Sequence, residues 1–285
     1  MLVPYNQILQ HARQYQFAVG AFNIYNLEGA LAVVRAAEEL DSPVLIQLLP
    51  SALALGGTPL IHLCLEAGKS AQVPVAVHLD HCSSQKEILA ALTAGISSVM
   101  ADGSMLDYAG NLAFTREIVQ AAGRHTAGVE GELGRLSGSE DGLTAKAASA
   151  KMTQPGRAAD FVKLTGISAL AVCIGNVHGT YKTEPRLDFE RLAAIAARVS
   201  IPLVLHGTSG LPDEMILRAV KEGVCKFNVN TEVRTAYSQA LSRLFKEVAV
   251  PELVDIIQSG IDAMKPPIKD KIRLFGSANK AHLYT

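Results

Sequence analysis

The 285-residue sequence predicts an α/β fold, a single (β/α)₈ TIM barrel with additional helices at its carboxyl end. The first observation behind this prediction is that short apolar segments alternate with segments of helical periodicity along the whole chain, which is typical of a parallel sheet covered by helices. The second is the length, because barrels of this type commonly have about 250 residues. No boundary between domains is visible, so we expect residues 1–285 to form one domain.

Nearly continuous apolarity characterises most of the predicted strands. Strands with this pattern are usually buried on both faces, as in parallel sheets. There are eight of them, which is the number that closes a TIM barrel. The predicted strands are Phe17–Asn23, Pro43–Leu48, Pro74–Leu79, Ile96–Ala101, Gly128–Glu132, Ala169–Gly175, Pro202–Gly207 and Val224–Val229.

Helical periodicity predicts helices between these strands. Clear examples are Leu27–Leu40, Leu187–Val199 and residues 212–223, the last of which begins with Pro212 and two acidic residues and ends at glycine. Residues 135–154 lack such a pattern and are rich in Gly and Ser with mixed charge. We therefore predict a long mobile loop at the active site in this segment, and further helices after the eighth strand.

Composition and charge exclude several classes of protein. The chain is 49% hydrophobic and 19% charged, so it can bury a large core, and its net charge of −1 argues against nucleic acid as a partner. The longest apolar stretch, Val44–Leu55, is interrupted and too short to span a bilayer, so we expect no membrane partner. The amino terminus lacks the pattern of a secretion signal, and the four cysteines are widely spaced, as suits reduced thiols. We expect a cytoplasmic protein.

Polar side chains gather where the predicted strands end. In a barrel the carboxyl ends of all strands meet at one rim, where active sites are built. One histidine at such a place would more often serve packing, but histidines at three different strand ends, with acids on strands between them, are hard to explain by packing. These residues are His78, Asp80, His81, Asp102, Glu130, Glu132, His178, His206, Asn228 and Asn230.

The three histidines at separate strand ends favour a metal site. Three neutral imidazoles with an open fourth position are typical of catalytic zinc, whereas closed cysteine-rich sets are structural. In the segment HLDH, His78 and Asp80 face the same side because alternate residues of a strand do so, and His81 lies just past the strand. Cys82 is a conceivable ligand, but a small buried hydrophobic residue is the favoured interpretation.

Glycines beside two of these histidines point to an anion. Gly179, Gly207 and Gly210 allow backbone N–H groups to approach an anion closely, and the loops after strands seven and eight often hold phosphate in such barrels. A helix that begins near Thr231 adds N–H donors. Ordinary turns and caps would explain any one of these features, but together they favour a phosphate site.

The segments HLDH, VEGELG, IGNVHGTYK, LHGTSG and NVNT identify a family resemblance. In this order and spacing, from AFN at residues 21–23 to the closing IRLFGSANKA, they resemble the class II ketose-bisphosphate aldolases, particularly the tagatose-bisphosphate branch. The resemblance covers essentially the whole chain. It implies a lyase that cleaves a ketose phosphate into dihydroxyacetone phosphate and an aldehyde, in a reversible reaction.

The resemblance also implies roles for individual residues. His81, His178 and His206 would bind Zn²⁺, while His78, Glu132 and Asp102 would offer an alternate or second metal position. Asp80 would transfer the proton of the aldehyde oxygen, and Glu140 that of the dihydroxyacetone-phosphate carbon. A monovalent cation, Na⁺ or K⁺, and a homodimer or homotetramer are further expectations. The substrate and its phosphate would be bound by Asn23, Gly179, Lys182, Gly207, Thr208, Ser209, Asn228, Asn230 and Thr231.

Two departures from the family pattern concern the aldehyde half of the substrate. Leu49 stands where the family usually has Ser or Thr, and the carboxyl-terminal region has no Asp-Pro-Arg triplet to bind a far phosphate. Since arginine is suited to forked phosphate recognition, we hypothesise an unphosphorylated or unusual aldehyde as well as glyceraldehyde 3-phosphate. Arg234, Arg243 or Arg273 would be alternative sources of the charge.

Two other classes of function compete with the aldolase. A zinc-dependent TIM-barrel hydrolase would also use histidines and an aspartate to activate water, but it has no need of the glycine-rich phosphate site. A non-catalytic subunit of an aldolase assembly would be expected to lack the metal ligands or Asp80, which this sequence retains.

Overall fold

Eight parallel strands form a closed barrel in the computed structural model, which describes residues 1–135, 137–140, 143–145, 151–179, 181 and 184–284; for 137–140, 143–145 and 178 it describes the backbone alone. The predicted TIM barrel is thereby confirmed, and each predicted strand has its counterpart. Around the barrel the strands follow the order β1-β11-β10-β8-β5-β4-β3-β2. Their bounds are β1 (Val19–Asn23), β2 (Val44–Leu48), β3 (Val75–Cys82), β4 (Ser98–Ala101), β5 (Gly128–Leu133), β8 (Ala169–Val172), β10 (Leu203–Leu205) and β11 (Val224–Val229).

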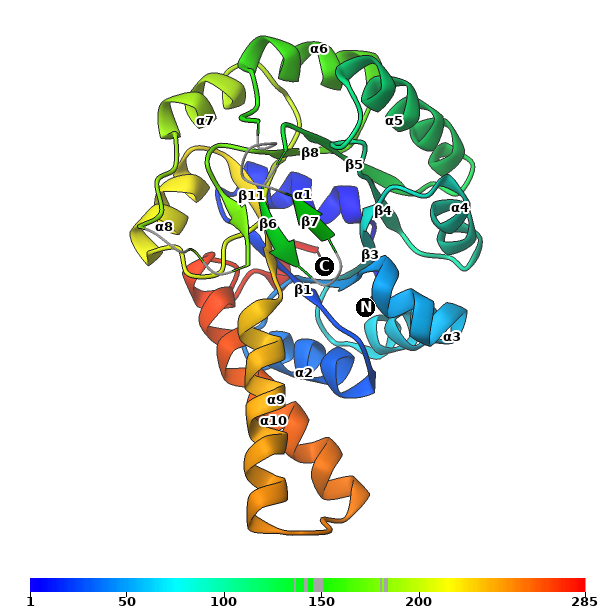
Figure 1. Cartoon of the computed structure of the whole chain (residues 1–285), viewed down its shortest axis with the longest axis vertical. Coiled ribbons are helices and arrows are strands. Elements are labelled where there is room, and N and C mark those ends of the chain that lie inside the picture. The colour runs from blue at the N-terminus through cyan, green and yellow to red at the C-terminus, as the bar shows by residue number, and fades with distance from the viewer. Residues whose placement is uncertain (136, 141–142, 146–150, 180, 182–183, 285) are drawn as a thin grey trace.

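Helices surround the barrel, and one closes its far end (Figure 1). The described part of the chain holds no helix that is long and apolar enough to cross a membrane. The first helix, α1, contacts β1, β3 and β11 and lies behind the barrel in this view. The helices are α1 (Tyr5–Gln14), α2 (Leu27–Glu38), α3 (Pro50–Ser70), α4 (Gln85–Thr93), α5 (Tyr108–Gly123), α6 (Pro155–Thr165), α7 (Phe189–Ala196), α8 (Asp213–Lys221), α9 (Thr231–Glu247) and α10 (Leu253–Leu274), followed by the 3₁₀ turn η2 (Ala281–Tyr284).

Two buried apolar clusters explain how the barrel accommodates a polar centre. The larger cluster lies between the strands and the surrounding helices, where branched side chains such as Ile46 and Val99 are fully buried. The smaller one joins inward-facing residues to α1 and contains several alanines, among them Ala21, Ala76 and Ala169. Because alanine fills little of the barrel interior, we infer that these positions leave room for the larger polar side chains of the centre.

The segment predicted as an irregular loop contains two short strands. β6 (Ser137–Glu140) and β7 (Leu143–Ala145) pair antiparallel, and β6 also pairs in parallel with β9 (Val177–His178). β6 and β7 lie in front of the barrel in Figure 1. They were not predicted because a Gly- and Ser-rich segment lacks the apolar alternation that marks a half-buried strand.

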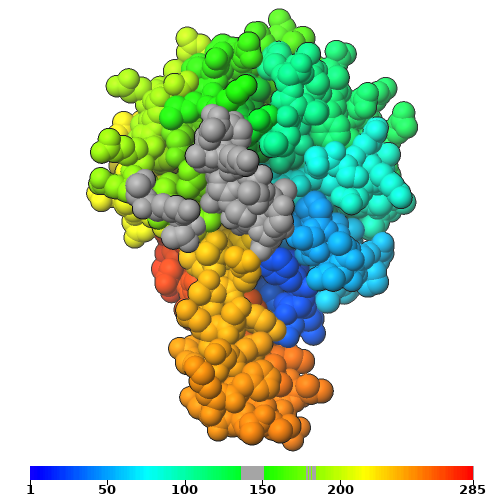
Figure 2. Space-filling view, in the orientation of Figure 1, coloured from blue at the N-terminus to red at the C-terminus, as the bar shows by residue number. Residues whose placement is uncertain are grey.

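The additional carboxyl-terminal helices form an arm. α9 and α10 pack against each other, and α10 also packs against α2 at the base of the arm. The rest of the hairpin extends away from the barrel, as Figures 1 and 2 show. Exposed apolar side chains gather toward its tip, with Val250 at 88%, Leu253 at 75% and Val254 at 74% exposure.

Candidate active site

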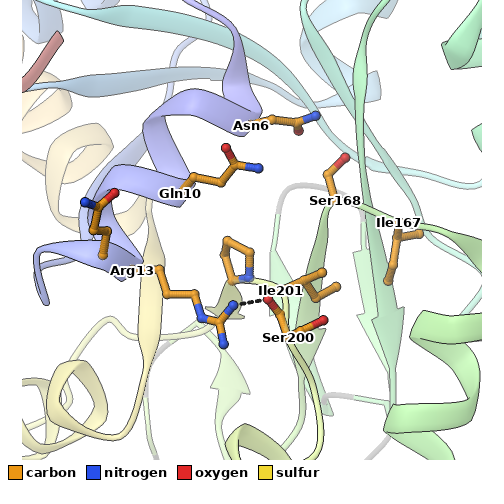
Figure 3. A pocket seen from close by; sticks show the side chains of 9 residues that line it. Asn6, Gln10, Arg13, Ile167, Ser168, Ser200 and Ile201 are labelled. Carbon is orange, nitrogen blue, oxygen red and sulfur yellow. Dashed lines mark hydrogen bonds between the residues drawn. The ribbon is translucent and has the colours of Figure 1, made fainter.

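A cleft of about 560 Å³ lies under α1, and Figure 3 shows the side chains that line it. Because some of them precede strands of the barrel, the cleft lies at the amino-terminal end, opposite to the predicted site. Asn6, Gln10 and Arg13 of α1 line it, together with residues that precede β8 and β10. The Arg13 guanidinium donates to the Ser200 carbonyl, so the one cation of this cleft already has a backbone partner. Since the amino-terminal face of such barrels serves stability and the carboxyl face catalysis, we look for the active site at the other end.

Asp80 on β3 is held by amide side chains from three other strands. Its carboxylate accepts hydrogen bonds from Asn228 Nδ2 at 3.0 and 3.2 Å, from Asn23 Nδ2 at 3.0 Å and from Gln47 Nε2 at 3.4 Å. The structure thus brings together the predicted residues Asn23, Asp80 and Asn228. Gln47 was missed, although a lone glutamine in the apolar strand VLIQL was a usable signal.

Asp80 is ionised in this environment. Burial raises the pKa of its carboxyl group, but the positive charges of His81 and Lys226 outweigh burial and lower the pKa to about 2. A carboxylate that is ionised and fixed by several donors can accept a proton from a substrate hydroxyl group. Asp80 is therefore placed and charged to act as a general base.

His81 lies within β3 rather than just past its end. The strand continues to Cys82, and its register with β4 shifts between Leu79 and Cys82. Strict alternation would turn His81 away from Asp80, but the backbone at His81 is left-handed, with φ +45°, which breaks the alternation. A non-glycine residue in this region costs on the order of 1–3 kcal/mol, and such strain is typical of functional sites.

Two carboxylates orient the imidazoles of His81 and His206. Asp102 Oδ2 lies 2.9 Å from His81 Nδ1, and Glu130 Oε1 lies 2.8 Å from His206 Nε2. Each carboxylate accepts an N–H, which directs the other ring nitrogen toward the partner imidazole. These two nitrogens, His81 Nε2 and His206 Nδ1, are 2.7 Å apart. Since both would otherwise be acceptors, a proton or a cation must lie between them.

The two imidazoles differ in their affinity for that proton. Burial lowers the pKa of His81, but the charges of Asp80 and Asp102 outweigh it and raise the pKa to about 10. Burial and the charge of His81 lower the pKa of His206. We infer that His81 carries the proton and donates it to His206 when no cation competes.

The described side chains fit a zinc ion. Asp80, His81 and His206 place one ligand atom each within 4.8 Å of one another, and so do His81, Asp102 and Glu132. Nitrogen and oxygen donors at such positions are those of catalytic zinc sites, and the carboxylate partners of the imidazoles are the usual second layer around it.

Buried polar atoms without a hydrogen-bond partner independently indicate that this site fits a polar ligand. Among the described side chains these include Gln47 Oε1, Glu132 Oε2 and Asn228 Oδ1, all in the same mouth of the barrel. A buried polar group without a partner costs about 1–3 kcal/mol, so several of them in one place indicate a site built for a polar ligand.

Of the other predicted metal ligands, two share a set of potential ligand atoms with His81 and one, His78, does not. Asp102 and Glu132 lie near His81, as the predicted second position requires. His78 joins neither group: its Nδ1 lies 2.9 Å from Ser98 Oγ, and its ring stacks on Tyr5 at 5.1 Å. Burial lowers the pKa of His78 to about 3, so this imidazole is neutral.

Three predicted residues lie wholly or partly outside the described structure. The side chains of His178 and Glu140 are among those left out, and Lys182 lies outside the described residues altogether. The backbone nevertheless relates the first two, because Gly138 of β6 pairs with His178 of β9 and Glu140 follows two residues later on β6. Their roles stay predictions.

Beneath the two imidazoles lies a charged network of which only Glu130 was predicted, as a residue of the rim. Glu130 Oε2 accepts from Tyr5 OH at 2.6 Å and from Lys226 Nζ at 2.9 Å, while its Oε1 faces His206. Burial raises the pKa of Glu130, but Lys226 and His206 lower it well below the usual value. The signal that could have found the network is a lysine inside the apolar strand VCKFNV.

Two residues of the predicted phosphate site, Gly207 and Thr208, directly follow His206 of the metal group. Gly179 and Gly207 adopt left-handed backbones with φ +79° and +62°, which a side chain would disfavour. α9 begins at Thr231, and its cap residue Asn230 makes no side-chain hydrogen bond to the first turn. The N–H groups of that turn therefore suit an anion. Backbone groups would bind the anion, because the hydroxyls of Thr208 and Ser209 already donate to Asn228 O at 2.9 Å and to Glu232 Oε2 at 2.6 Å.

Comparison with known proteins decides the family. A family model described as fructose-bisphosphate aldolase class-II matches residues 3–280. The chain belongs to this class II aldolase family. Membership implies a lyase, and the family generally uses zinc, which agrees with the donor set of His81 and His206.

Solved structures support the same assignment. The YdjI aldolase from Escherichia coli K12 is 35% identical, with a TM-score of 0.88 over 99% of this chain and 100% of that one. A provisionally assigned fructose-1,6-biphosphate aldolase from Coccidioides immitis is 33% identical, with a TM-score of 0.92 over 98% of both chains. The fructose-bisphosphate aldolase of Campylobacter jejuni is 25% identical, with a TM-score of 0.80 over 98% of this chain and 97% of that one.

Proposed function

We propose that this class II aldolase is zinc-dependent and reversibly cleaves a ketose phosphate into dihydroxyacetone phosphate and an aldehyde. The observation that carries the proposal is the geometry around His81 and His206. Two carboxylates orient these imidazoles so that ring nitrogens 2.7 Å apart face each other beside the ionised Asp80. A hydrolase could use the same donors, but the family match favours the aldolase.

The residues of the site divide the chemistry between them. Zinc, when bound, would stabilise the negative charge that develops on the oxygens of the dihydroxyacetone-phosphate half during cleavage. Asp80 would remove the proton of the hydroxyl that becomes the aldehyde oxygen, and Asn23 and Asn228 would keep its carboxylate in place. Glu140 would move the proton at the dihydroxyacetone-phosphate carbon. His81, His178 and His206 would hold the metal.

We also propose that an unphosphorylated aldehyde is accepted. A cleft of about 240 Å³ opens next to Asn23 and is lined by Tyr25, Arg234 and Tyr237 over an apolar floor. Leu49, where relatives usually have a hydroxyl residue, is buried and apolar. Arg234 lines this cleft and Arg273 does not, so Arg234 is the better placed of these two arginines for a phosphate.

A panel of aldol condensations tests both parts of this proposal. Zinc-loaded protein should condense dihydroxyacetone phosphate with at least one neutral aldehyde, and a chelator should abolish the reaction. The product sugars, once identified, would report the stereochemistry at C4. A kcat/KM for glyceraldehyde 3-phosphate well above that of every neutral aldehyde would contradict the substrate proposal. If substitution of Arg234 then removed this preference, Arg234 would be the residue that binds the aldehyde phosphate. Retention of full activity without any divalent metal would contradict the zinc proposal.

The arm suggests how the molecule associates. We propose that its apolar tip, formed by Val250, Leu253 and Val254, packs against a second copy of the chain to form a homodimer or homotetramer. The arm points away from its own barrel, so these side chains lie beyond the reach of their own core. Leu253→Asp should lower the molar mass measured by light scattering, whereas Leu217→Asp on α8, also exposed, should not. A monomeric wild-type protein would contradict the proposal.

A further inference from the structure

A second cleft at the carboxyl face lies outside the metal group and the predicted phosphate site. It has a volume of about 480 Å³, within the range of small-molecule sites. Its walls come from the turn between β4 and α5, the end of β5 and the start of α6. None of the roles assigned to the aldolase chemistry uses its side chains.

Three cationic side chains line this cleft: Arg135, Lys151 and Arg157. Within the described part of the chain, no carboxylate lies within ion-pair distance of any of them. Arg135 Nε donates to the Ser104 carbonyl at 2.9 Å, which fixes its guanidinium at the wall. The guanidinium of Arg157 lies over the Tyr108 ring, 5.2 Å from its centre. Two of the three cationic groups are therefore held in place before any ligand arrives.

One carboxylate lines the same cleft, and it is already engaged. Asp107 caps α5 by accepting from Gly110 N at 2.8 Å. With three cations and one anion, the cleft carries a net charge of about +2 at neutral pH. That excess favours a ligand with two negative charges.

The beginning of α6 adds to the positive field. Gln154, the cap residue, makes no side-chain hydrogen bond to the first turn, and both Gln154 and Arg157 line the cleft. The unpaired N–H groups of a helix start carry about half a positive charge. This contribution reinforces the cations and would not suffice without them.

The framework of the cleft is rigid. Thr153 accepts from Cys173 N at 2.8 Å, donates to the Leu133 carbonyl, and so ties the start of α6 to the ends of β5 and β8. Asn111 at the base donates to the Glu132 carbonyl at 2.8 Å. Because these groups bond to one another, the cleft does not need to form on binding.

We propose that this cleft binds a phosphate monoester, as a second anion site separate from the substrate phosphate site. Two arginine forks and a lysine suit a phosphate dianion, and the net charge of the lining matches it. The volume of the cleft exceeds that of phosphate alone and leaves room for the organic part of the ester against Tyr108 and Met152. A phosphorylated small metabolite is therefore the class of ligand. This inference does not rest on the proposed substrate.

Equilibrium dialysis with labelled inorganic phosphate tests the site on the full-length, zinc-loaded protein. Wild-type protein should bind two phosphates, one at the substrate site and one in the cleft. Lys151→Gln/Arg157→Gln should lose one of them or weaken it at least tenfold. The matched control is Arg124→Gln/Lys163→Gln, which removes two exposed cations from the far ends of α5 and α6 and should keep both sites.

Two results would overturn the proposal. The first is equal phosphate binding by the cleft variant and the control, with unchanged melting temperatures showing that both are folded. The second result concerns the organic part of the ester. Glucose 6-phosphate should bind the cleft more tightly than inorganic phosphate does, where binding to the cleft is the amount of ligand bound by the control variant minus the amount bound by the cleft variant. Equal or weaker binding of glucose 6-phosphate would show that the cleft holds an adventitious ion only.

Discussion

Two adjacent layers inside the barrel differ in whether their buried polar groups have partners within the protein. In the rim layer, which comprises Asp80, His81, His206, Asn228 and the adjoining Gln47 and Glu132, three buried atoms have no hydrogen-bond partner among the described residues: Gln47 Oε1, Glu132 Oε2 and Asn228 Oδ1. In the layer beneath, formed by Tyr5, Glu130 and Lys226, every charged group is satisfied by the protein itself, and the one unpartnered atom beside these three residues is Nε2 of the neutral His78. Both layers are almost fully buried, so burial alone does not explain the difference.

The contrast indicates which layer is built for a ligand. A polar group left unpartnered costs stability, and it persists where a bound metal or substrate will use it. In the layer beneath, hydrogen bonds and ion pairs within the protein offset the cost of burying the charges, so this layer does not need a ligand. Glu130 joins the two layers, since it binds Lys226 below and orients His206 above. Substitutions in the two layers should therefore have different consequences.

The largest effect is expected at Asp80 in the rim layer. Asp80→Ala should lower kcat by about 10²–10⁴-fold, the usual contribution of a general acid–base group, while zinc content stays near one per chain. Steady-state kinetics and metal analysis on the same preparation would measure both. Asp160→Asn, an exposed acid on α6, is the control and should change neither.

The alternative outcome at Asp80 is equally informative. Asp80 lies within 4.8 Å of the ligand atoms of His81 and His206, so geometry alone would permit it to bind the metal. Loss of zinc together with activity would assign it as a ligand and refute its role as the base. Unchanged turnover would refute the assigned mechanism altogether.

The sequence predicted the barrel and most of the rim because both leave local signals. Apolar runs of four to eight residues mark buried parallel strands, and polar residues at their carboxyl ends mark the rim, which is why Asp80, His206 and Asn228 were found. The inward turn of His81 left no such signal, since it depends on a left-handed backbone inside β3.

The layer beneath could not be predicted in the same way. Lys226 and Tyr5 are 221 positions apart in the numbering, and they bind the same oxygen of Glu130 only because α1 closes the barrel under β11. A lysine in an apolar strand predicts that a partner exists, but it does not identify Glu130 as that partner. Pairings of this kind follow from the register of the closed barrel rather than from any local pattern.

The next largest effect is expected at Glu130. Glu130→Gln leaves the buried Lys226 ammonium without its anion, which should lower the free energy of unfolding by about 3–5 kcal/mol, and it loosens His206, which should weaken zinc binding by about 10–100-fold. Asp102→Asn at the partly exposed rim should weaken zinc similarly but cost far less stability. Urea unfolding of metal-free protein and a zinc competition assay separate the two quantities.

A second substitution sharpens this comparison. Glu130→Gln/Lys226→Met removes both members of the buried pair, so much of the lost stability should return while zinc affinity stays low. If the double variant also regained zinc affinity, Glu130 would act on the metal through stability alone. Its assignment as the residue that positions His206 would then be wrong.

A smaller, graded effect is expected from pH. Because the carboxylates beside His81 raise its pKa to about 10, metal-free protein keeps that proton at neutral pH, and zinc must displace it. Zinc affinity should therefore rise about tenfold from pH 7 to pH 8, with close to one proton released per zinc, and fall as pH drops. Calorimetry in buffers of different ionisation enthalpy counts the proton. Asp102→Asn should release less, and no release from wild type would contradict the assigned proton.

The smallest effect is expected at Tyr5, which donates one of the three hydrogen bonds that Glu130 receives. Burial and the nearby Glu130 charge raise the pKa of Tyr5 well above its usual value, so the phenol stays a neutral donor. Tyr5→Phe keeps the stacking on His78 and leaves Lys226 paired, so the free energy of unfolding should fall by about 1–3 kcal/mol and kcat by no more than a few-fold. Tyr15→Phe, at the half-exposed residue that caps the end of α1, should leave both unchanged. A loss of zinc as large as that of Glu130→Gln would mean that α1 itself positions His206, and the two layers would then form one unit.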